Sequence, residues 1–468
     1  MSSTKPVTDD ADVRAGRLSD EKIASNFADM HPPLTPAEAI IDADRCYFCY
    51  DAPCVTACPT GIDIPGFIQN IRSGNLRGSA HTILSENIMG GMCARVCPTE
   101  VLCEQACVRN THEDRPVRIG LLQRHATDPV LVPGTKSLSS PHAPLFERAP
   151  ATGRRVAVVG GGPAGLSCAH RLAMLGHNVV VFEPRDKLGG LNEYGIAAYK
   201  TPGDFAAREV DYILSIGGIE VRSGMALGKD CVLPELRAQY DAVFLGFGLA
   251  GVNGLGLDNE RLEGVLNAVD YIELLRQVPD KASLPVGRRV LVIGGGMTAI
   301  DIAVQSKALG AEEVTIVYRR GQEHMNASGY ELEFAQARGV TVRFWASPSR
   351  LLITDGRVHG LEFETTSLAP DGRLQGTGRM FTLDADVVFK AIGQKVLWER
   401  LASTAEIVAL KNDRILCDGE RRTSLPGVWA GGDCVFGGAD LTVSAVQDGK
   451  IAAMSIDRFL KDKGPREK

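Results

Sequence analysis

Residues 154–183 read RRVAVVGGGPAGLSCAHRLAMLGHNVVVFE, and this stretch decides the fold. A short apolar strand enters a glycine-rich turn, an amphipathic helix follows, and a second strand ends on Glu183. In the turn, Gly160 bends the chain, Gly162 lets backbone N–H groups approach a phosphate, and Gly165 allows helix and strand to pack closely. The helix N-terminus adds further N–H groups and partial positive charge. The stretch therefore predicts a Rossmann-type site for the pyrophosphate of a dinucleotide.

A second stretch of the same kind follows at residues 289–317. Its turn reads Gly294-x-Gly296-x-x-Ala, again between an apolar strand and a helix. A single Gly-x-Gly-x-x-Gly pattern is weak, but two such units in one chain form an internal repeat. They predict one site for each of two dinucleotides.

The ends of the two second strands indicate which dinucleotide binds at each site. The first ends on Glu183, which suits free ribose hydroxyls, whereas the second ends on Tyr318-Arg319-Arg320, without an acid. Because arginine forks pair well with a 2′-phosphate, Arg319 and Arg320 favour NADPH. The alternative, in which both arginines are solvated and either NADH or NADPH serves, stays open.

Composition and charge restrict the class of protein. A chain of 468 residues predicts about three domains. Its 44% hydrophobic content and mean hydropathy of -0.02 are typical of a globular protein, and its net charge of -6 argues against binding to nucleic acid or to an anionic membrane. The polar N-terminus is not a secretory signal. We therefore expect a cytoplasmic protein.

The cysteines point to metal. Eight of the twelve lie between Cys46 and Cys107, and disulfide frameworks are rare in a reducing compartment. Thiolates suit iron, and the Cys-Pro pairs resemble those of two-cluster ferredoxins. Zinc is the alternative, but zinc sites usually pair two Cys-x2-Cys units and this segment has one. The spacing predicts two 4Fe–4S clusters and, by itself, favours Cys93 as a ligand.

Local patterns predict several further elements. The first forty residues read as a polar arm that ends where Thr35-Pro36 opens a helix. We expect helix over residues 65–86, and we expect Thr99 to cap a helix that sets Cys103 and Cys107 on one face. Later in the chain we expect a linker over residues 128–150, antiparallel strands over 341–382 and a return to the first nucleotide domain over 386–393.

Three stretches resemble a known family. Residues 45–68 (RCYFCYDAPCVTACPTGIDIPGFI), 93–107 (CARVCPTEVLCEQAC) and 118–126 (RIGLLQRHA) are similar to the N-terminal module of dihydropyrimidine dehydrogenase and of the related glutamate synthase small subunit. The resemblance implies a glutamine ligand for one cluster, in place of Cys93. The implied first set is Cys46, Cys49, Cys54 and Cys107. The implied second set is Cys58, Cys97, Cys103 and Gln123.

The resemblance covers nearly the whole chain and also implies how the nucleotides are held. Lys200 falls where the family has a basic residue near FAD, although a solvated surface lysine is an alternative. For FAD the motifs and the resemblance together indicate Gly160, Gly162, Pro163, Ala164, Gly165, Glu183, Gly190, Leu191, Lys200, Gly432, Asp433 and Thr442. For NAD(P)H they indicate Gly294, Gly296, Met297, Thr298, Arg319, Arg320, Ala391, Ile392 and Gly393.

The expected fold is α/β, with an N-terminal α-helical double 4Fe–4S module followed by two Rossmann-like domains. The expected ranges are 1–150 for the iron–sulfur domain and linker, 151–251 and 387–468 for the two parts of an FAD domain, and 252–386 for the NAD(P)H domain inserted between them.

The resemblance implies a function as well. NAD(P)H would reduce FAD, and electrons would pass through the clusters to a partner FMN/iron–sulfur subunit that reduces uracil or thymine. The alternatives are the small subunit of NADPH-dependent glutamate synthase, a stand-alone NAD(P)H:acceptor oxidoreductase, and a redox sensor without turnover. Asn326 stands where the animal type of the family has a third basic residue, which weakens the NADP assignment.

Overall fold

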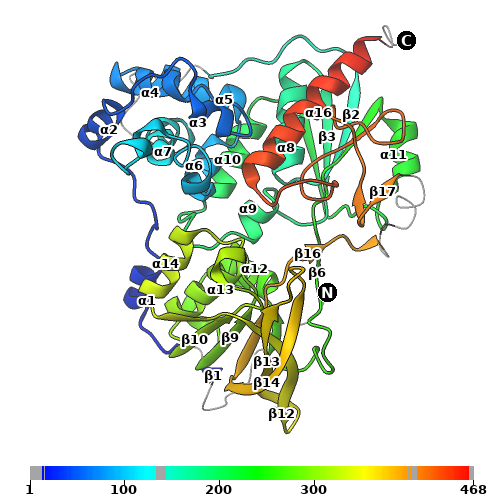
Figure 1. The fold of residues 1–468 in the computed structure, drawn as a ribbon. Helices are drawn as coiled ribbons and strands as arrows, with labels where there is room; N and C mark the ends of the chain where they lie inside the picture. The colour runs from blue at the N-terminus through cyan, green and yellow to red at the C-terminus, as the bar shows by residue number, and fades with distance from the viewer. Residues whose placement is uncertain (1–12, 15, 133–143, 399–400, 402–407, 463–468) are drawn as a thin grey trace. The chain divides into compact units, whose positions relative to one another are not determined.

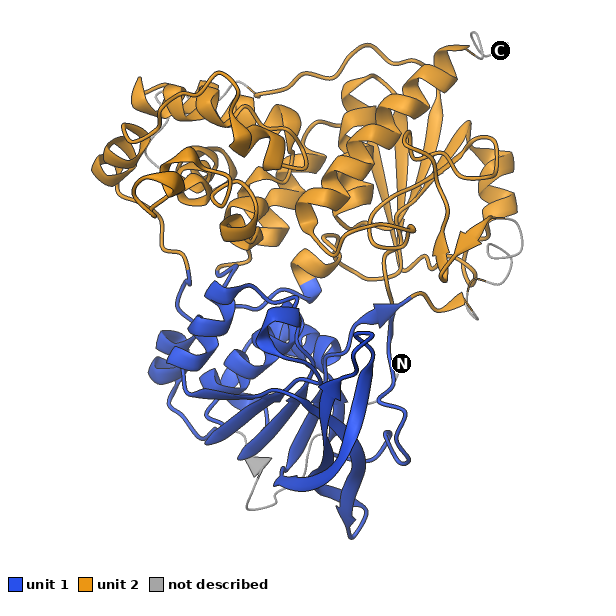
Figure 2. Cartoon of the chain, in the orientation of Figure 1, with its two compact units in different colours: residues 1–30, 194–202, 251–395 blue, residues 31–193, 203–250, 396–468 orange. Residues whose placement is uncertain are grey.

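The computed structural model describes residues 13–14, 16–132, 144–398, 401 and 408–462 (Figure 1). The chain divides into two compact units, which Figure 2 colours separately. Unit 1 comprises residues 1–30, 194–202 and 251–395, and unit 2 comprises residues 31–193, 203–250 and 396–468. Each unit contains one five-stranded parallel sheet, so the prediction of two Rossmann-like domains is confirmed.

The sheet of unit 2 has the strand order β19-β5-β2-β3-β4. Its strands are β2 (Arg155–Val159), β3 (Asn178–Glu183), β4 (Ile219–Ser223), β5 (Ala242–Leu245) and β19 (Val428–Ala430). The central strands are apolar and buried, as in parallel sheets covered on both faces. The accompanying helices are α8 (Pro163–Met174), α10 (Phe205–Leu214), α11 (Leu233–Gln239) and α16 (Thr442–Asp462).

Close packing of α16 on α8 depends on a glycine. A Cβ atom at Gly449 would lie 2.1 Å from the carbonyl oxygen of Ala164. This packing holds the last helix against the helix that follows the first glycine-rich turn. Unit 2 also contains a short hairpin of β17 (Leu410–Lys411) and β18 (Arg414–Ile415).

Residues 31–132 form the cysteine module of unit 2. Its helices are α2 (Pro36–Ala43), α3 (Pro53–Ala57), α4 (Ile64–Arg72), α5 (Leu76–Glu86), α6 (Gly90–Val96) and α7 (Ile119–Leu131). Thr35 caps α2 in a capping box with Glu38, as the sequence predicts. The expected linker begins later than residue 128, because α7 continues to Leu131, and residues 133–143 lie outside the described part of the chain.

One local prediction in this module is wrong. Thr99 opens only the 3-10 turn η1 (Thr99–Val101), and Cys103 and Cys107 lie on turns before η2 (Val108–Thr111). The Thr99 carbonyl accepts from the N–H groups of Leu102, Glu104 and Gln105, which closes a compact turn rather than a continuing helix.

The sheet of unit 1 has the order β11-β10-β9-β15-β7. Its strands are β7 (Val265–Asn267), β9 (Arg289–Ile293), β10 (Glu313–Val317), β11 (Val340–Arg343) and β15 (Val387–Lys390). Its helices include α12 (Ala268–Gln277), α13 (Met297–Ala308) and α14 (Gly329–Ala337), with the 3-10 turns η3 (Lys281–Ser283) and η4 (Gln322–His324). The sequence predicts that the chain returns to the first nucleotide domain over residues 386–393. In the structure, β15 pairs with β9 and β7, so this segment still belongs to the sheet of unit 1.

Antiparallel strands lie between β11 and β15 in unit 1, as the sequence predicts, except that the expected start at residue 341 is wrong, because β11 pairs in parallel with β10. They are β12 (Ala346–Thr354), β13 (Arg357–Leu368) and β14 (Leu374–Asp384). Asp355 and Gly356 both have positive φ, at 51° and 80°, which suits a tight hairpin turn. A further short pair joins β6 (Gly251–Val252) to β16 (Gln394–Lys395).

The N-terminal segment is not a free arm. Strand β1 (Val13–Arg14) pairs with β8 (Val286–Gly287), and helix α1 (Asp20–Asn26) belongs to unit 1. Ile23 and Phe27 are buried in the core of that unit, and Asn26 Nδ2 donates to the carbonyl of Ala308 at 2.9 Å. Residues 16–30 are thus grouped with unit 1 rather than with the cysteine module of unit 2.

No helix in the described ranges combines the length and the apolarity that crossing a lipid bilayer requires.

Candidate functional site

The first glycine-rich turn is built so that only glycine fits. Gly160 has φ 102°, and a Cβ there would lie 2.3 Å from the carbonyl oxygen of Gly246. A Cβ at Gly165 would lie 1.9 Å from the Gly160 carbonyl oxygen. Around Gly162, by contrast, a Cβ would meet only Gly190 Cα, at 3.7 Å. The turn is thus tightly packed at Gly160 and Gly165 and open at Gly162, where a phosphate is expected.

Glu183 closes this turn from the neighbouring strand. Its carboxylate accepts from the N–H of Gly161 at 2.7 Å and from the N–H of Arg185 at 3.1 Å. Burial raises the pKa of Glu183, and the two N–H groups lower it. The acid is therefore held in place at the end of β3, as a ribose-binding acid must be.

The Gly189–Gly190 turn lies against the phosphate turn. Gly189 N–H donates to the carbonyl of Gly161 at 2.7 Å, and a Cβ at Gly190 would lie 2.8 Å from Gly162 Cα. Leu191, the next residue, begins the short helix α9 (Leu191–Tyr194). The structure therefore brings Gly190 and Leu191 to the first turn, as the sequence predicts.

The end of β19 and the start of α16 complete the same edge of the sheet. Gly432 N–H donates to Asp448 at 2.9 Å, and a Cβ at Gly248 would lie 3.4 Å from Asp433 Oδ1. Burial, aided by the charge of Asp440, raises the pKa of Asp433 to about 6. Thr442 donates to Asn192 Oδ1 at 2.7 Å. Asp448 and Asn192 were not predicted from the sequence, because each is defined by a contact with a distant segment.

The second turn, in unit 1, repeats the design. Gly294 has φ 153°, and a Cβ there would lie 2.2 Å from the carbonyl oxygen of Ala391, which places Ala391 directly against the turn. No atom lies within 4 Å of a Cβ at Gly296, so the turn is open there. Met297 and Thr298 begin α13. Asn253 Nδ2 donates to the Ile392 carbonyl, and a Cβ at Gly393 would lie 3.4 Å from that nitrogen.

The loop after β10 folds back on this turn. The N–H groups of Asn326 and Ala327 donate to the carbonyl of Gly295, and a Cβ at Gly295 would collide with the ring of Tyr318. Arg319 is exposed, whereas Arg320 is half-buried and its Nε has no hydrogen-bond partner within the described structure. The carbonyls of both arginines accept hydrogen bonds, from Thr366 Oγ1 and from the N–H of Trp345, so the backbone of this loop is fixed.

Lys200 is buried in unit 1. Its Nζ lies 2.6 Å from Glu331 Oε1 and 2.8 Å from Asp301 Oδ1, and Tyr199 Oη donates to the same Asp301 oxygen at 3.1 Å. Burial lowers the pKa of Lys200, but the two carboxylates outweigh this effect and raise it. Lys200 is thus not a solvated surface lysine; its proposed contact with FAD stays a prediction.

The first predicted cysteine set converges on one cavity. Cys46, Cys49, Cys54 and Cys107 all line it, together with apolar side chains such as Ile64 and Ile68. Burial raises the pKa of Cys54 to about 11. Because burial disfavours free thiolates here, binding to a cation such as iron would stabilise them. The donor set fits a cluster.

The second predicted set lies next to the first in the same apolar core. Cys58 and Cys103 pack on this core. The pKa of Cys97 is raised by its hydrogen bond with Cys93, then by burial and by the nearby Cys103 and Cys58. Gln123 is 7% exposed, and its Nε2 donates to the Gly90 carbonyl at 2.6 Å. This bond uses the amide nitrogen of Gln123 and not the amide oxygen, the atom that would bind a cluster. Both Cys93 and Gln123 border the set, so the choice between them stays a prediction.

These cysteines do not form a single-ion site. In the described ranges, no three His, Cys, Asp or Glu side chains are placed to hold one metal ion.

Comparison with known proteins adds a second kind of observation. Residues 23–134 match the family described as dihydropyrimidine dehydrogenase domain II, 4Fe-4S cluster, and residues 154–449 match the pyridine nucleotide-disulphide oxidoreductase family. The NAD-dependent dihydropyrimidine dehydrogenase subunit PreT of Salmonella typhimurium is 34% identical over 445 residues, which cover 93% of this chain and 98% of the relative. The NADPH glutamate synthase small chain of Escherichia coli is 32% identical over 458 residues, which cover 93% and 94%.

Solved structures support the fold. FprA from Mycobacterium tuberculosis in complex with NADPH is 19% identical, with a TM-score of 0.57 over 68% of this chain and 87% of that chain. Thioredoxin reductase from T. acidophilum is 20% identical, with a TM-score of 0.51 over 66% and 99%. Identities this low show a shared fold alone.

Proposed function

Because the chain belongs to the pyridine nucleotide-disulphide oxidoreductase family and carries a 4Fe–4S domain of the dihydropyrimidine dehydrogenase type, we propose that this FAD-dependent NAD(P)H oxidoreductase is the electron-input subunit of a dihydropyrimidine dehydrogenase. It would pass electrons from NAD(P)H to a separate FMN- and iron–sulfur-containing subunit that reduces uracil or thymine. The observation that carries the proposal is the 34% identity over 98% of the length of the PreT subunit. The reducing cytoplasm, where cluster-forming thiols stay reduced, is the proposed location.

The residues of unit 2 divide the binding of FAD between them. The open turn at Gly162 and the N-terminus of α8 would take the pyrophosphate, and Glu183 would accept from ribose hydroxyls. Asp433 and Thr442 lie at the same edge of the sheet and would orient the rest of the cofactor. When bound, FAD converts a two-electron hydride donor into one-electron steps that a cluster can accept.

The two cysteine sets would hold two 4Fe–4S clusters within the same unit. The first cysteine set lines an apolar cavity. The second set, which includes Cys58, Cys97 and Cys103, lies beside it. The apolar shell excludes water, which influences the reduction potentials of bound clusters. The module thus provides a place for electrons to leave the flavin one at a time.

For the nucleotide in unit 1 we propose NADPH as the preferred donor, with NADH as a possible second donor. The exposed Arg319 and the half-buried Arg320, at the end of β10, support this preference, since guanidinium groups pair well with a 2′-phosphate. Each charge-assisted hydrogen bond contributes about 1.5–3 kcal/mol. The variant Arg319→Ala/Arg320→Ala is therefore expected to lower the NADPH/NADH ratio of kcat/KM by about tenfold or more.

A matched control is available in the same unit. Arg350 lies on β12 with its side chain 67% exposed, and Arg350→Ala should leave the ratio unchanged. An unchanged ratio in the double variant would overturn the NADPH assignment.

The partner is tested by anaerobic affinity purification from the native host followed by mass spectrometry. Co-elution of an FMN-binding subunit with its own cysteine motifs, and NAD(P)H-dependent loss of uracil by that complex, would support the proposal. A very large amidotransferase-type partner would instead indicate glutamate synthesis, the second candidate, which the 32% identity to the glutamate synthase small chain favours. No partner and no loss of uracil would point to a stand-alone oxidoreductase.

A further inference from the structure

Asn192 connects three segments of unit 2 that are distant in the sequence. It follows the Gly189–Gly190 turn and is only 1% exposed. Its Oδ1 accepts from Thr442 Oγ1 at 2.7 Å, and its Nδ2 donates to Met89 Sδ at 3.6 Å. One amide therefore contacts both the first residue of α16 and the residue that precedes α6.

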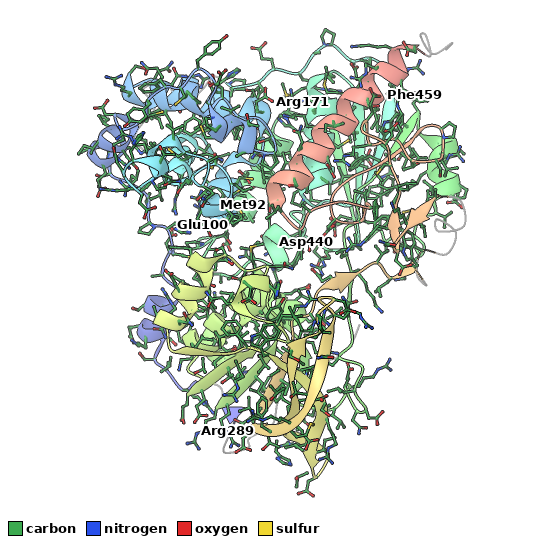
Figure 3. The ribbon with its side chains drawn as sticks, in the orientation of Figure 1. Met92, Glu100, Arg171, Arg289, Asp440 and Phe459 are labelled. Atoms are coloured by element: carbon green, nitrogen blue, oxygen red, sulfur yellow. The ribbon has the colours of Figure 1, made fainter. Side chains whose placement is uncertain are left out.

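Met89 in turn is part of the peptide segment that carries the second cysteine set. It is 1% exposed, and its carbonyl accepts from the N–H of Cys93 at 2.9 Å. The next carbonyl, that of Gly90, accepts from Gln123 Nε2 at 2.6 Å. Figure 3 labels Met92 in α6 and Asp440 just before α16, which locate the two ends of this connection within unit 2.

The geometry points to Asn192 as a positioning residue that couples the flavin site to the cluster module. This inference rests on the proposed function only in that it takes FAD and the cluster near Gln123 as bound; it requires neither the partner subunit nor a pyrimidine. On one side the amide fixes the hydroxyl of Thr442, and on the other it fixes the sulfur of Met89. Both partners are thereby held in one arrangement.

The hydrogen bonds of this buried amide can influence the reduction potentials of both cofactors. A buried amide that loses one partner is left with an unsatisfied group, which is costly, so its two contacts stabilise each other. Hydrogen bonds and dipoles near a flavin or a cluster change its potential. With both cofactors bound, reduced FAD would supply two electrons, one at a time, each reducing one cluster by one electron, and its proton would pass to solvent.

The test compares variants that remove one end of the connection at a time. Thr442→Val removes the hydroxyl, Met89→Leu removes the sulfur, and Asn192→Leu removes the amide. The purified holoprotein is mixed with NADPH under anaerobic conditions, and reduction of the cluster is followed by freeze-quench EPR. The flavin midpoint potential is measured in parallel by spectroelectrochemistry.

We expect Met89→Leu and Thr442→Val each to slow cluster reduction by about tenfold and to act non-additively, because the two side chains communicate through Asn192. In the Asn192→Leu background this coupling should disappear. Met92→Leu is the matched control, since Met92 lies in α6, three residues after Met89, and is equally buried at 1%.

Two results would overturn the inference. One is a Met89→Leu protein whose cluster reduction and flavin potential equal those of Met92→Leu. The other is a pair of effects for Thr442→Val and Met89→Leu that simply multiply. If Thr442→Val loses FAD, the comparison of Met89→Leu with Met92→Leu still decides, and neither measurement depends on whether a pyrimidine-reducing partner exists.

Discussion

Lys200 Nζ lies 2.6 Å from Glu331 Oε1 in the interior of unit 1, and the side chains of both residues are less than a tenth exposed. Asp301 is the second acid of this cluster, 2.8 Å from the same nitrogen. A buried cation between two carboxylates is a strong constraint, because removal of the cation leaves two negative charges in an apolar environment.

Replacing the cation should therefore destabilise the protein. We expect Lys200→Met to lower the free energy of unfolding by about 3–5 kcal/mol, the cost of an uncompensated buried charge. Denaturant unfolding measures this change, and Lys22→Met, at an exposed position in the same unit, is the control. A Lys200→Met protein as stable as the control would show that the ion pairs of Lys200 with Glu331 and Asp301 do not stabilise the folded protein. The absorbance spectrum of bound flavin in the same variant tests whether Lys200 also contacts FAD.

Glu209 should make stability depend on pH. Burial raises its pKa to about 8, although the N–H groups of Met92 and Gly91 and the nearby Arg95 oppose this shift, and Asp128 adds to it. In the unfolded chain the pKa is about 4.3. Between these values the folded state binds the proton that the unfolded state has lost. The free energy of unfolding should thus fall as pH rises from about 4.3 to about 8, by up to about 1.4 kcal/mol per pH unit.

The variant Glu209→Gln isolates this effect. The glutamine oxygen keeps both hydrogen bonds to Gly91 and Met92 but cannot ionise. Measured between pH 5 and 8 by denaturant midpoints, the variant should gain stability relative to the parent as pH rises. The exposed Glu235→Gln serves as the control. Parallel pH profiles for parent and Glu209→Gln would contradict the prediction.

The identity of the eighth cluster ligand can be read by EPR. Gln123→Leu should change the signal of one reduced cluster and leave the other signal intact, because the amide oxygen of Gln123 is the proposed ligand and its nitrogen is already bonded to Gly90. Cys93→Ala should leave both signals unchanged. The reverse pattern would assign the ligand to Cys93, as the spacing of the cysteines alone suggests.

Alanine substitutions at the two open glycine positions, Gly162 and Gly296, should each weaken the binding of one nucleotide and leave the other site intact. A Cβ at Gly296 meets no atom within 4 Å, and a Cβ at Gly162 meets only one, so both alanine variants should fold. Gly296→Ala should raise the KM for NAD(P)H by about tenfold, with normal FAD content, since the methyl group keeps phosphate away from the backbone. Gly162→Ala should yield protein poor in FAD. Equal FAD content and KM in parent and variants would place the phosphates elsewhere.

The sequence predicts what local chemistry determines. The glycine-rich turns are visible because close approach requires glycine there, as the contacts of Gly165 and Gly294 show. Thr35 is visible because its capping box is a local pattern. The helix expected after Thr99 does not form, since its carbonyl closes a compact turn instead.

Contacts between distant segments could not be predicted in this way. Helix α1 is short and mostly polar, and only the core of unit 1 reveals that Ile23 and Phe27 are buried. Glu209 and Asn192 look like ordinary polar residues in the sequence. Their roles depend on Gly91 and Met89, which lie more than a hundred residues earlier in the chain.

The pairing of β1 with β8 has a consequence for the order in which the protein is made. The first strand leaves the ribosome about 270 residues before its partner, so at typical synthesis rates it waits roughly 14 to 55 s. During this interval Ile23 and Phe27 lack the core that later covers them, while the cysteine module of unit 2 is already complete in sequence. The nascent chain thus exposes the apolar side chains of Ile23 and Phe27 until the core of unit 1 is made, and chaperones that bind exposed apolar side chains have time to reach them.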